Sequence, residues 1–342
     1  MGRKPTTNLN LPPLMRKRTQ KSGKAFYYLD TGEKPRKEIP LGGDYLLALQ
    51  KYADLRKTAK IDNGVFGNVI ERYMSDELPK LSKNTINTHT YDIKHLKKYF
   101  TDAPLNQIRP MHIKKLLENL KSTPTTANRC KRLFSTLWNH ARGWGYTDLE
   151  NPCTGIKGFS LEKRTVYITD AVFNAVRSCA SETLIDALDL AYLTGQRPAD
   201  TLKMKASDIA NGFLLVDQGK TQKKLRISVT GELATVLGRI VVRKAQHKIE
   251  NDQLLMNGDG KAFTLPALRS HFDRAKIAAA KQSPEFAADI KAFRFYDLRA
   301  KAADDTSDDR GDQAASDLLG HDNVKTTQRH YLRRGKIVEP TK

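Results

Sequence analysis

The chain has 342 residues, with 59 Lys or Arg against 38 Asp or Glu, so its formal net charge is +21. The length predicts two or three domains, and a hydrophobic content of 39% is enough for packed cores. There is no run of about 18 apolar residues and no apolar segment at the start, so we expect neither a membrane span nor a secretory signal. The cysteines Cys130, Cys153 and Cys179 are far apart, which is typical of a reducing cytosol rather than of a disulfide framework or a zinc cluster.

The positive excess predicts a polyanionic partner, and nucleic acid is the first candidate. Residues 1–62 carry 14 basic and 6 acidic side chains (+8), residues 63–160 carry 15 and 8 (+7), and residues 161–342 carry 30 and 24 (+6). The net positive charge per residue is highest in the first two segments. We therefore expect nucleic acid to be held mainly there.

The first segment, residues 1–62, is predicted to begin with a disordered basic arm over residues 1–23. The elements predicted after the arm are strands at Lys24–Asp30 and Arg36–Leu41, a turn at Gly32–Pro35, and a helix capped by Asp44 that runs through Lys60. This β-hairpin-plus-helix module is either a small DNA-binding module or a solvated β-rich appendage.

Residues 63–150 are predicted to be all-helical, because apolar residues recur at helical spacing in four stripes. Ser82 and Thr123 are suitable helix starts. We interpret the stripes as core rather than as a cofactor site. Cations lie between them, which predicts a bundle that lies on a phosphate backbone, although each cation alone is explained as a solvated residue. The candidate DNA contacts are Lys94, Lys97, Lys98, Lys114, Lys115, Arg129, Lys131 and Arg132.

Glycine and proline are dense between Gly143 and Gly158, which predicts a domain boundary. We expect a linker over residues 151–164 and a mixed domain over residues 165–342. Its first predicted elements are helices at Ala171–Ser178 and Glu182–Thr194 and strands at Phe213–Val216 and Leu225–Val229. The predicted fold class of the chain is mostly α with small β elements (α+β).

Four short islands in the last segment hold side chains suited to phosphate chemistry. They are Thr194-Gly195-Gln196-Arg197 with Asp200 shortly after, Gly219-Lys220-Thr221 in a turn between predicted strands, Tyr296-Asp297-Leu298-Arg299, and Leu318-Leu319-Gly320-His321 followed by Tyr331.

In this order and combination the islands resemble those of the tyrosine recombinases, specifically the phage integrases of the lambda type. That family has an Arg in a TGxR island, a Lys on a β-hairpin, an HxxR island, a His or Trp after LxG, and a nucleophilic Tyr. The resemblance extends to three segments, an arm-binding module (1–62), a helical SAM-like core-binding domain (63–150) and a catalytic domain (165–342). The catalytic set that it implies is Arg197, Lys220, Tyr296, Arg299, His321 and Tyr331, supported by Asp200.

The resemblance implies a site-specific DNA recombinase that integrates a mobile element into a host chromosome through a 3′-phosphotyrosine intermediate. It implies core-type and arm-type sites in double-stranded DNA, a homotetramer in synapsis, and a DNA-bending host factor and an excisionase as further partners. The implied location is the bacterial cytosol, away from membranes.

The residue types suit this chemistry independently of the family. Two guanidiniums can hold the phosphoryl oxygens of a pentavalent transition state, and a Lys can protonate the departing 5′-oxygen. A His can donate to a phosphoryl oxygen or accept the phenol proton. A phenol, with an ordinary pKa of about 10, becomes a workable nucleophile among cations. Nothing in this scheme requires a metal or another cofactor, or ATP.

Two positions depart from the family pattern. Tyr296 stands where the family usually has His, and a phenol is a poorer proton shuttle at neutral pH, so this side chain is either an active-site donor or a packed aromatic. The spacing from His321 to Tyr331 is one residue longer than in many members, which predicts a small insertion. His330, beside Tyr331, is a rival for proton handling.

Several alternatives stay open. Arg197 is otherwise a surface residue at a helix start, Arg299 a surface partner of Asp297, and Tyr331 a core aromatic. Lys223 and Lys224 compete with Lys220. The acidic residues Asp304, Asp305, Asp308, Asp309 and Asp312 lack the spacing of a calcium loop and are interpreted as a helix surface and turn.

Two other functions compete with the recombinase. One is a DNA-binding regulatory or architectural protein that has lost catalysis, which the Tyr at position 296 makes conceivable. The other is a relaxing enzyme like the type IB topoisomerases, which uses the same phosphotyrosine chemistry without exchanging partners.

Overall fold

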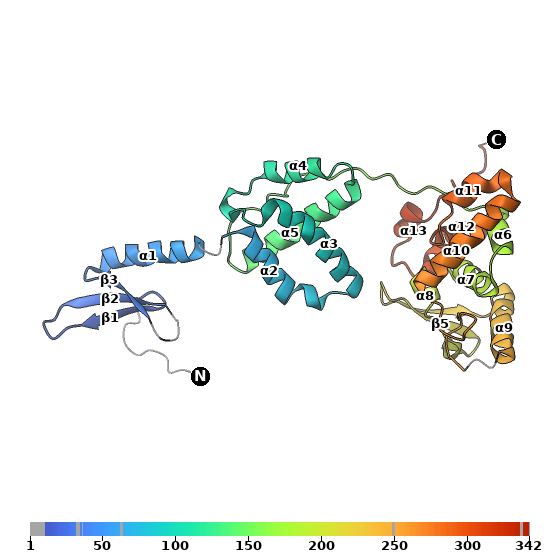
Figure 1. Ribbon diagram of the computed structural model, residues 1–342, viewed down its shortest axis with the longest axis horizontal. Helices are drawn as coiled ribbons and strands as arrows, with labels where there is room; N and C mark the ends of the chain where they lie inside the picture. Colours follow the sequence, from blue (N-terminus) through green and yellow to red (C-terminus); the bar gives the residue numbers. More distant parts are fainter. Residues whose placement is uncertain are drawn as a thin grey trace. The chain divides into compact units, whose positions relative to one another are not determined.

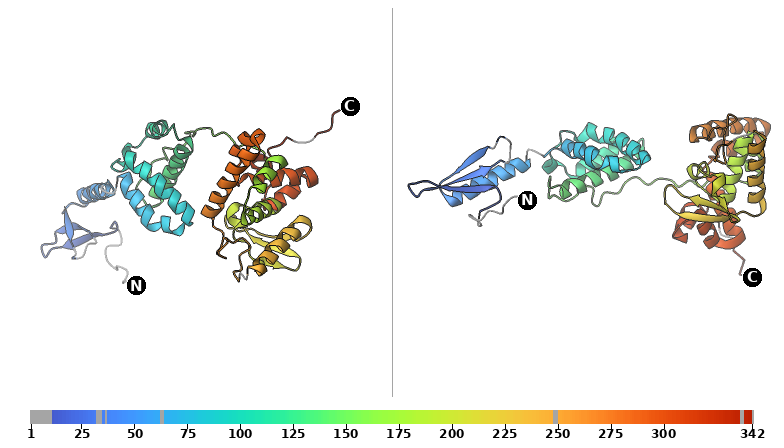
Figure 2. Two further views of the ribbon diagram at one scale, coloured as in Figure 1. Left: turned by 45° about the vertical axis from the view of Figure 1, so that its right-hand side comes forward. Right: turned by 90° about the horizontal axis from the view of Figure 1, so that it is seen from below.

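The computed structural model describes residues 11–31, 35, 37–61, 64–247, 250–335 and 338–341, with the backbone alone over 56–61. The chain divides into two compact units, Met1–Glu162 and Lys163–Lys342 (Figure 1 and Figure 2). The predicted class is confirmed, since each described unit is mainly helical with one small antiparallel sheet. Among the described helices, none is both long and apolar enough to span a membrane.

The N-terminal module is a three-stranded antiparallel sheet followed by a helix. Its elements are β1 (Met15–Thr19), β2 (Ala25–Asp30), β3 (Glu38–Gly42) and α1 (Tyr45–Ile61). Asp44 caps the helix as predicted, because its Oδ1 accepts from the backbone N–H of Leu47 at 2.9 Å. The two predicted strands are confirmed, whereas Arg36 and residues 32–34 of the predicted turn lie outside the described residues.

Strand β1 corrects the prediction of a disordered arm over residues 1–23. It pairs with β2 so that Arg16 lies opposite Tyr28 and Arg18 opposite Phe26. Arg18 also reaches Glu38 of β3 at 2.5 Å and lies 5.1 Å from the Tyr28 ring. A strand whose exposed positions are cations shows no alternation of apolar residues, so periodicity did not reveal it.

The second module is a bundle of four helices, which confirms the all-helical prediction. These are α2 (Phe66–Asp76), α3 (Lys83–Phe100), α4 (Pro110–Asn119) and α5 (Pro124–Gly143), with short 3-10 turns η1 (Leu78–Lys80) and η2 (Leu105–Gln107). Ser82 caps α3, and α5 begins directly after Thr123, as predicted. The stripes form the core, where the Phe66 and Phe134 rings stack with centroids 4.3 Å apart.

The first part of the expected linker over residues 151–164 packs on this bundle. The Asn128 side chain donates to the Phe159 carbonyl and accepts from the Phe159 backbone N–H, both at 2.8 Å. Cys153 is buried, and Ile156 and Phe159 pack against the same apolar cluster. These contacts hold the chain against α5 for more than a dozen residues after that helix ends.

The second unit combines helices with a small antiparallel sheet in the order β4-β5-β6. Its first elements are α6 (Asp170–Ser178), α7 (Glu182–Thr194), α8 (Pro198–Thr201), η3 (Ala206–Asp208), β4 (Ile209–Ala210), β5 (Phe213–Asp217) and β6 (Lys224–Ser228). The remaining ones are α9 (Gly231–Gln246), α10 (Leu265–Gln282), η4 (Pro284–Phe286), α11 (Ala287–Ala292), α12 (Asp297–Leu319) and α13 (Val324–His330). The two helices and two strands predicted here are confirmed.

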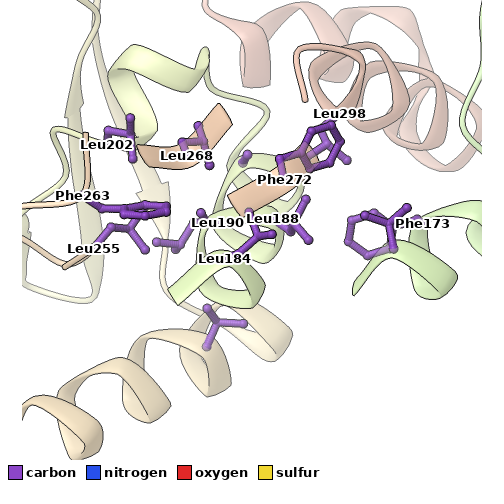
Figure 3. Packing of buried hydrophobic residues seen from close by; sticks show 14 of the residues in the cluster. Phe173, Leu184, Leu188, Leu190, Leu202, Leu255, Phe263, Leu268, Phe272 and Leu298 are labelled. Carbon is purple, nitrogen blue, oxygen red and sulfur yellow. The ribbon is translucent and has the colours of Figure 1, made fainter. Parts of the chain in front are cut away.

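Helix α7 runs through the core of this unit. Figure 3 shows its residues Leu184, Leu188 and Leu190 among apolar side chains from α10 and from the loop that holds Leu255 and Phe263. The helix ends at Gly195 with φ +64°, and α12 ends at Gly320 with φ +68°. Glycine tolerates this left-handed conformation, so both helices stop abruptly and their following loops meet.

Candidate active site

The candidate catalytic residues converge on one cleft of about 710 Å³. Arg197 lies at the start of α8, Lys220 in the β5–β6 turn, Tyr296 at the start of α12, His321 just after α12, and Tyr331 just after α13 (Figure 1). All five line the cleft, and Arg299 lies directly behind them in contact with His321 and Tyr331. Residues spread over 135 positions of sequence are thus brought to one place.

Tyr331 lies among polar and cationic groups. Its hydroxyl is 3.0 Å from the hydroxyl of Tyr296, its ring centroid is 4.9 Å from that of His321, and Arg299 Cζ lies 5.2 Å from its ring centroid. Burial raises the pKa of Tyr331, but the hydrogen bond from Tyr296 and the charges of nearby arginines outweigh burial and leave the pKa below its ordinary value. The Tyr331 phenolate is therefore formed more readily here than at an ordinary tyrosine.

Tyr296 lines the cleft and contacts Tyr331, so it is not an aromatic packed in a core. Its side chain remains 43% exposed and faces the cleft. Burial of its hydroxyl and the hydrogen bond with Tyr331 raise the pKa of Tyr296 to about 12. When Tyr331 is ionised, its phenolate oxygen can only accept, so Tyr296 is the donor of the pair in that state.

Arg299 is buried, with 1% of its surface exposed, so it is not a surface partner of Asp297. Its Nη1 donates to the Gly195 carbonyl at 2.7 Å, and its Nη2 donates to the Leu319 carbonyl at 2.8 Å. Nη2 also lies 3.2 Å from His321 Nε2. The guanidinium therefore fastens together the loops that follow α7 and α12.

His321 is held as a neutral imidazole. Its Nε2 faces the Arg299 donor, and its Nδ1 lies 2.8 Å from the Thr327 hydroxyl, so the hydrogen is assigned to Nδ1. Burial and the charges of Arg299 and Arg197 lower the pKa of His321 to about 4. A bound phosphate would bring negative charge and favour its protonated form.

Arg197 and Asp200 link the first island to the lysine turn. Arg197 Nη1 donates to Gln218 Oε1 at 3.2 Å and lies 3.8 Å from Asp200 Oδ2. Asp200 Oδ1 accepts from the Gly219 backbone N–H at 3.0 Å. The supporting role expected of Asp200 thus has a geometric basis.

Among the competing lysines, Lys220 is the one that lines the cleft. Lys223 forms an ion pair with Asp322, and Lys224 is the first residue of β6. His330 also lines the cleft and is exposed, but the imidazole that packs against Tyr331 belongs to His321.

The acidic residues of α12 accept hydrogen bonds and form ion pairs within the unit. Asp304 accepts from the backbone N–H groups of Arg333 and Arg334, and Asp305 pairs with Lys301 and Arg334. In the part of the chain that the structure describes, no cluster of three or more His, Cys, Asp or Glu is placed to hold a metal ion.

The bundle cations differ in their surroundings. Arg129 makes a two-pronged contact with buried Asp92 at 2.8–3.2 Å, and Lys97 pairs with Glu71 at 2.6 Å. Lys131 is half-buried. The exposed candidates are Lys94, Lys98, Lys114, Lys115 and Arg132.

Sequence reasoning missed three residues that hold the site together. Gln218 contacts Arg197, Thr327 orients His321, and Arg333 ties the segment after Tyr331 to Asp297. Gln218 sits beside the Gly219-Lys220 island, which is a usable signal. Thr327 carries none, because it stands in no recognisable motif, and Arg333 carries none, because its partner Asp297 is 36 positions away.

A sheet-and-helix module, a helical bundle and a mixed unit with this constellation are features of the tyrosine recombinase class. The model described as "Phage integrase family" matches residues 163–336, just over half of the chain, and "Phage integrase, N-terminal SAM-like domain" matches residues 65–121. The chain belongs to the phage integrase family.

Similar proteins include the integrases of Enterobacteria phage 434, 24% identical over 333 residues (91% of this chain and 92% of the relative), and of Escherichia phage lambda, 23% identical over 332 residues with the same coverage. Among solved structures, a lambda integrase dimer bound to a COC′ core site shares the fold with a TM-score of 0.70 and 20% identity. A lambda integrase tetramer bound to a Holliday junction gives a TM-score of 0.69, also at 20% identity. Each alignment covers 98% of this chain and 99% of that chain.

Proposed function

We propose that this chain is a site-specific recombinase that cleaves and rejoins DNA through a bond between Tyr331 and a 3′-phosphate, and so integrates a mobile element into a host chromosome. The observation that carries the proposal is a tyrosine with a lowered pKa in a cleft that also holds Arg197, Lys220 and His321. This near-complete set also argues against a regulatory protein that has lost catalysis.

In the cleavage step, the Tyr331 oxygen attacks phosphorus while the bond from phosphorus to the 5′-oxygen breaks. Lys220, exposed at the cleft, protonates the departing 5′-oxygen. His321, whose ring lies against that of Tyr331, takes the proton that Tyr331 loses, since the negative charge of the bound phosphate raises the basicity of the imidazole. Rejoining is the reverse reaction, with a 5′-hydroxyl as the attacking group.

The two arginines divide their work. Arg197 lines the cleft and is the guanidinium that contacts the phosphoryl oxygens. Arg299 is buried on two carbonyls, so it stabilises the transition state through its charge and through the placement of His321.

The scheme uses neither a metal ion nor ATP. The arginines supply the charge that a metal would otherwise provide, and the phosphotyrosyl bond retains the energy of the phosphodiester it replaces. Resealing is therefore nearly isoenergetic.

We extend the proposal to partners and modules. Lambda integrase has been solved as a dimer bound to a core site and as a tetramer bound to a Holliday junction. For this chain we propose core-site binding by residues 63–150 and 165–342, arm-site binding by residues 1–62, and a synaptic homotetramer in the bacterial cytosol. A DNA-bending host factor and an excisionase complete the proposed assembly.

The test is to incubate the purified protein with fragmented genomic DNA of the bacterium that carries its gene, and to sequence the fragments that stay protein-linked after denaturation. We expect a few related sites with the protein on the 3′-phosphate, and strand exchange only between two such sites. Adducts on any sequence with relaxation by a monomer would instead indicate a topoisomerase-like enzyme. Binding without adducts would indicate a regulatory protein.

A further inference from the structure

We propose that Gln218 is a positioning residue that holds the Lys220 turn in place beside Arg197 and His321. This inference rests on the proposed function, since it concerns how the proton donor of strand cleavage is placed. Gln218 is the residue at the base of the β5–β6 turn, two positions before Lys220, and it is fully buried.

The amide of Gln218 uses its hydrogen-bonding capacity on four different partners. Its Oε1 accepts from Arg197 Nη1 at 3.2 Å and from the Thr221 hydroxyl at 2.6 Å. Its Nε2 donates to Gln196 Oε1 at 2.8 Å and to the Leu319 carbonyl at 3.0 Å. A side-chain amide has two N–H donors and two acceptor lone pairs, so every hydrogen-bonding position of Gln218 is occupied.

These partners belong to three separate loops that carry catalytic candidates. Gln196 and Arg197 follow α7, Thr221 directly follows Lys220, and Leu319 ends α12 two residues before His321. The amide therefore fixes the distances among the three loops. Because it is buried, losing one partner would leave an unpaired polar group away from water.

Gly320 makes this approach possible. A Cβ at that position would lie 2.9 Å from Gln218 Nε2, closer than real side chains come, and the backbone there has φ +68°. A glycine is thus required both by the turn and by the amide that packs against it. The close contact indicates that the loop after α12 is shaped around Gln218.

Lys220 depends on this support because its own side chain is exposed on a tight turn. The turn is fastened through Thr221 to Gln218 and through the Gly219 N–H to Asp200. Displacement of a catalytic group by about 1 Å costs on the order of 100-fold in rate. Loosening the Gln218 amide should therefore slow protonation of the leaving oxygen.

A substrate with a sulfur leaving group distinguishes a role in positioning Lys220 from a general structural role of Gln218. When the scissile 5′-oxygen is replaced by sulfur, the departing thiol, with a pKa of about 8.5, leaves without a proton donor. A defect confined to Lys220 disappears on this substrate. A defect in folding, DNA binding or phosphate contact does not.

The experiment measures single-turnover adduct formation by the full chain on an attachment-site duplex with either a normal or a sulfur-substituted scissile linkage. For Gln218→Met, which keeps size but removes the amide, we expect a loss of about 100-fold on normal DNA and a remaining loss of less than about tenfold on the sulfur substrate, due to the lost contact with Arg197. Lys220→Ala should behave in the same way, and Arg197→Ala should be slow on both substrates.

Two further variants test whether misfolding explains the loss of rate. Thr221→Val removes one bond to Gln218 from an exposed position and should give a smaller loss that sulfur also restores. Thr183→Val removes the hydrogen bond to the Met256 carbonyl elsewhere in the unit and should leave both rates unchanged. The proposal is overturned if Gln218→Met and Thr221→Val each lose as much rate on the sulfur substrate as on normal DNA. It is also overturned if neither variant loses rate on normal DNA. If the unaltered protein forms no adduct on either substrate, the proposed function itself fails.

Discussion

At the scale of single residues, the contact between Tyr296 and Tyr331 places a second phenol beside the proposed nucleophile. The hydroxyls are 3.0 Å apart, and the hydrogen bond lowers the pKa of Tyr331. We propose that the Tyr296 hydroxyl stabilises the Tyr331 phenolate as a donor, without itself shuttling a proton.

Tyr296→Phe removes that donor. Because the pKa of Tyr331 then rises, we expect the pH–rate profile of adduct formation to move to higher pH and the rate at pH 7 to fall about tenfold or more, as for the loss of a hydrogen bond to a charged group. Tyr296→His keeps a donor and should be tolerated or should improve cleavage. An unchanged profile in Tyr296→Phe, or complete loss in Tyr296→His, would contradict this role.

His321 makes a prediction about stability. Its pKa is about 4 in the folded protein and about 6.5 when unfolded, so between these values the unfolded chain binds more protons. This contribution is complete above pH 6.5 and is lost as the pH falls toward 4. The free energy of unfolding in urea should fall less between pH 7 and pH 4 for His321→Gln than for the unaltered protein. Parallel curves would contradict a lowered pKa of His321.

The catalytic candidates could be predicted from sequence because each sits in a short local motif. Their support could not. Sequence placed Arg299 in the catalytic set but could not show that the fold buries it on the Gly195 and Leu319 carbonyls. Thr327 meets His321 only because α13 packs on α12.

At the scale of elements, the start of α12 is a junction. Asp297, its first residue, is fully buried and accepts from Arg164 at 2.5–2.7 Å, from Arg333 at 2.7 Å and from the Arg294 backbone N–H at 2.8 Å. Burial raises the pKa of Asp297, but these donors outweigh it and hold the pKa below its ordinary value. The same helix start thus ties down the segment that follows Tyr331.

Arg333→Ala breaks one arm of this junction. Removal of one partner of a buried pair costs about 3–5 kcal/mol, and since Arg164 remains we expect about 2–3 kcal/mol. Denaturant unfolding measures the loss, and adduct formation should slow because Tyr331 loses its anchor two residues away. Arg310→Ala, at an exposed pair with Asp309, is the matched control and should change neither quantity. Equal effects of the two variants would argue against the junction.

Element prediction succeeded where apolar periodicity was strong, as in α2 to α5 and α7. It failed at β1, because the run Arg16, Lys17 and Arg18 lacks the apolar alternation that predicts a strand. The strand forms by pairing with the aromatic-rich strand β2. Element prediction also could not show that residues 151–159 pack on α5, because that contact depends on Asn128.

At the scale of the whole molecule, the charge of +21 is unevenly placed. Residues 1–160 carry +15 of it, and residues 161–342 carry +6 over a longer stretch. Contacts from such cations to phosphates set affinity and register without reading sequence.

DNA affinity should therefore fall steeply and linearly with salt on a logarithmic plot. The second unit alone, residues 163–342, should bind more weakly and with a shallower slope, because fewer phosphates are neutralised. Titrations of both proteins from low to physiological salt measure the slopes. Equal slopes would show that the first unit contributes no phosphate contacts.

The most direct test of the recombinase proposal is the identity of the residue bound to DNA. After trypsin digestion of the covalent adduct, the proposal predicts a nucleotide linked through its 3′-phosphate to Tyr331, on the peptide of residues 330–333. Tyr331→Phe should bind the same DNA with unchanged affinity and form no adduct. A nucleotide on another residue, or an adduct that persists in Tyr331→Phe, would contradict it.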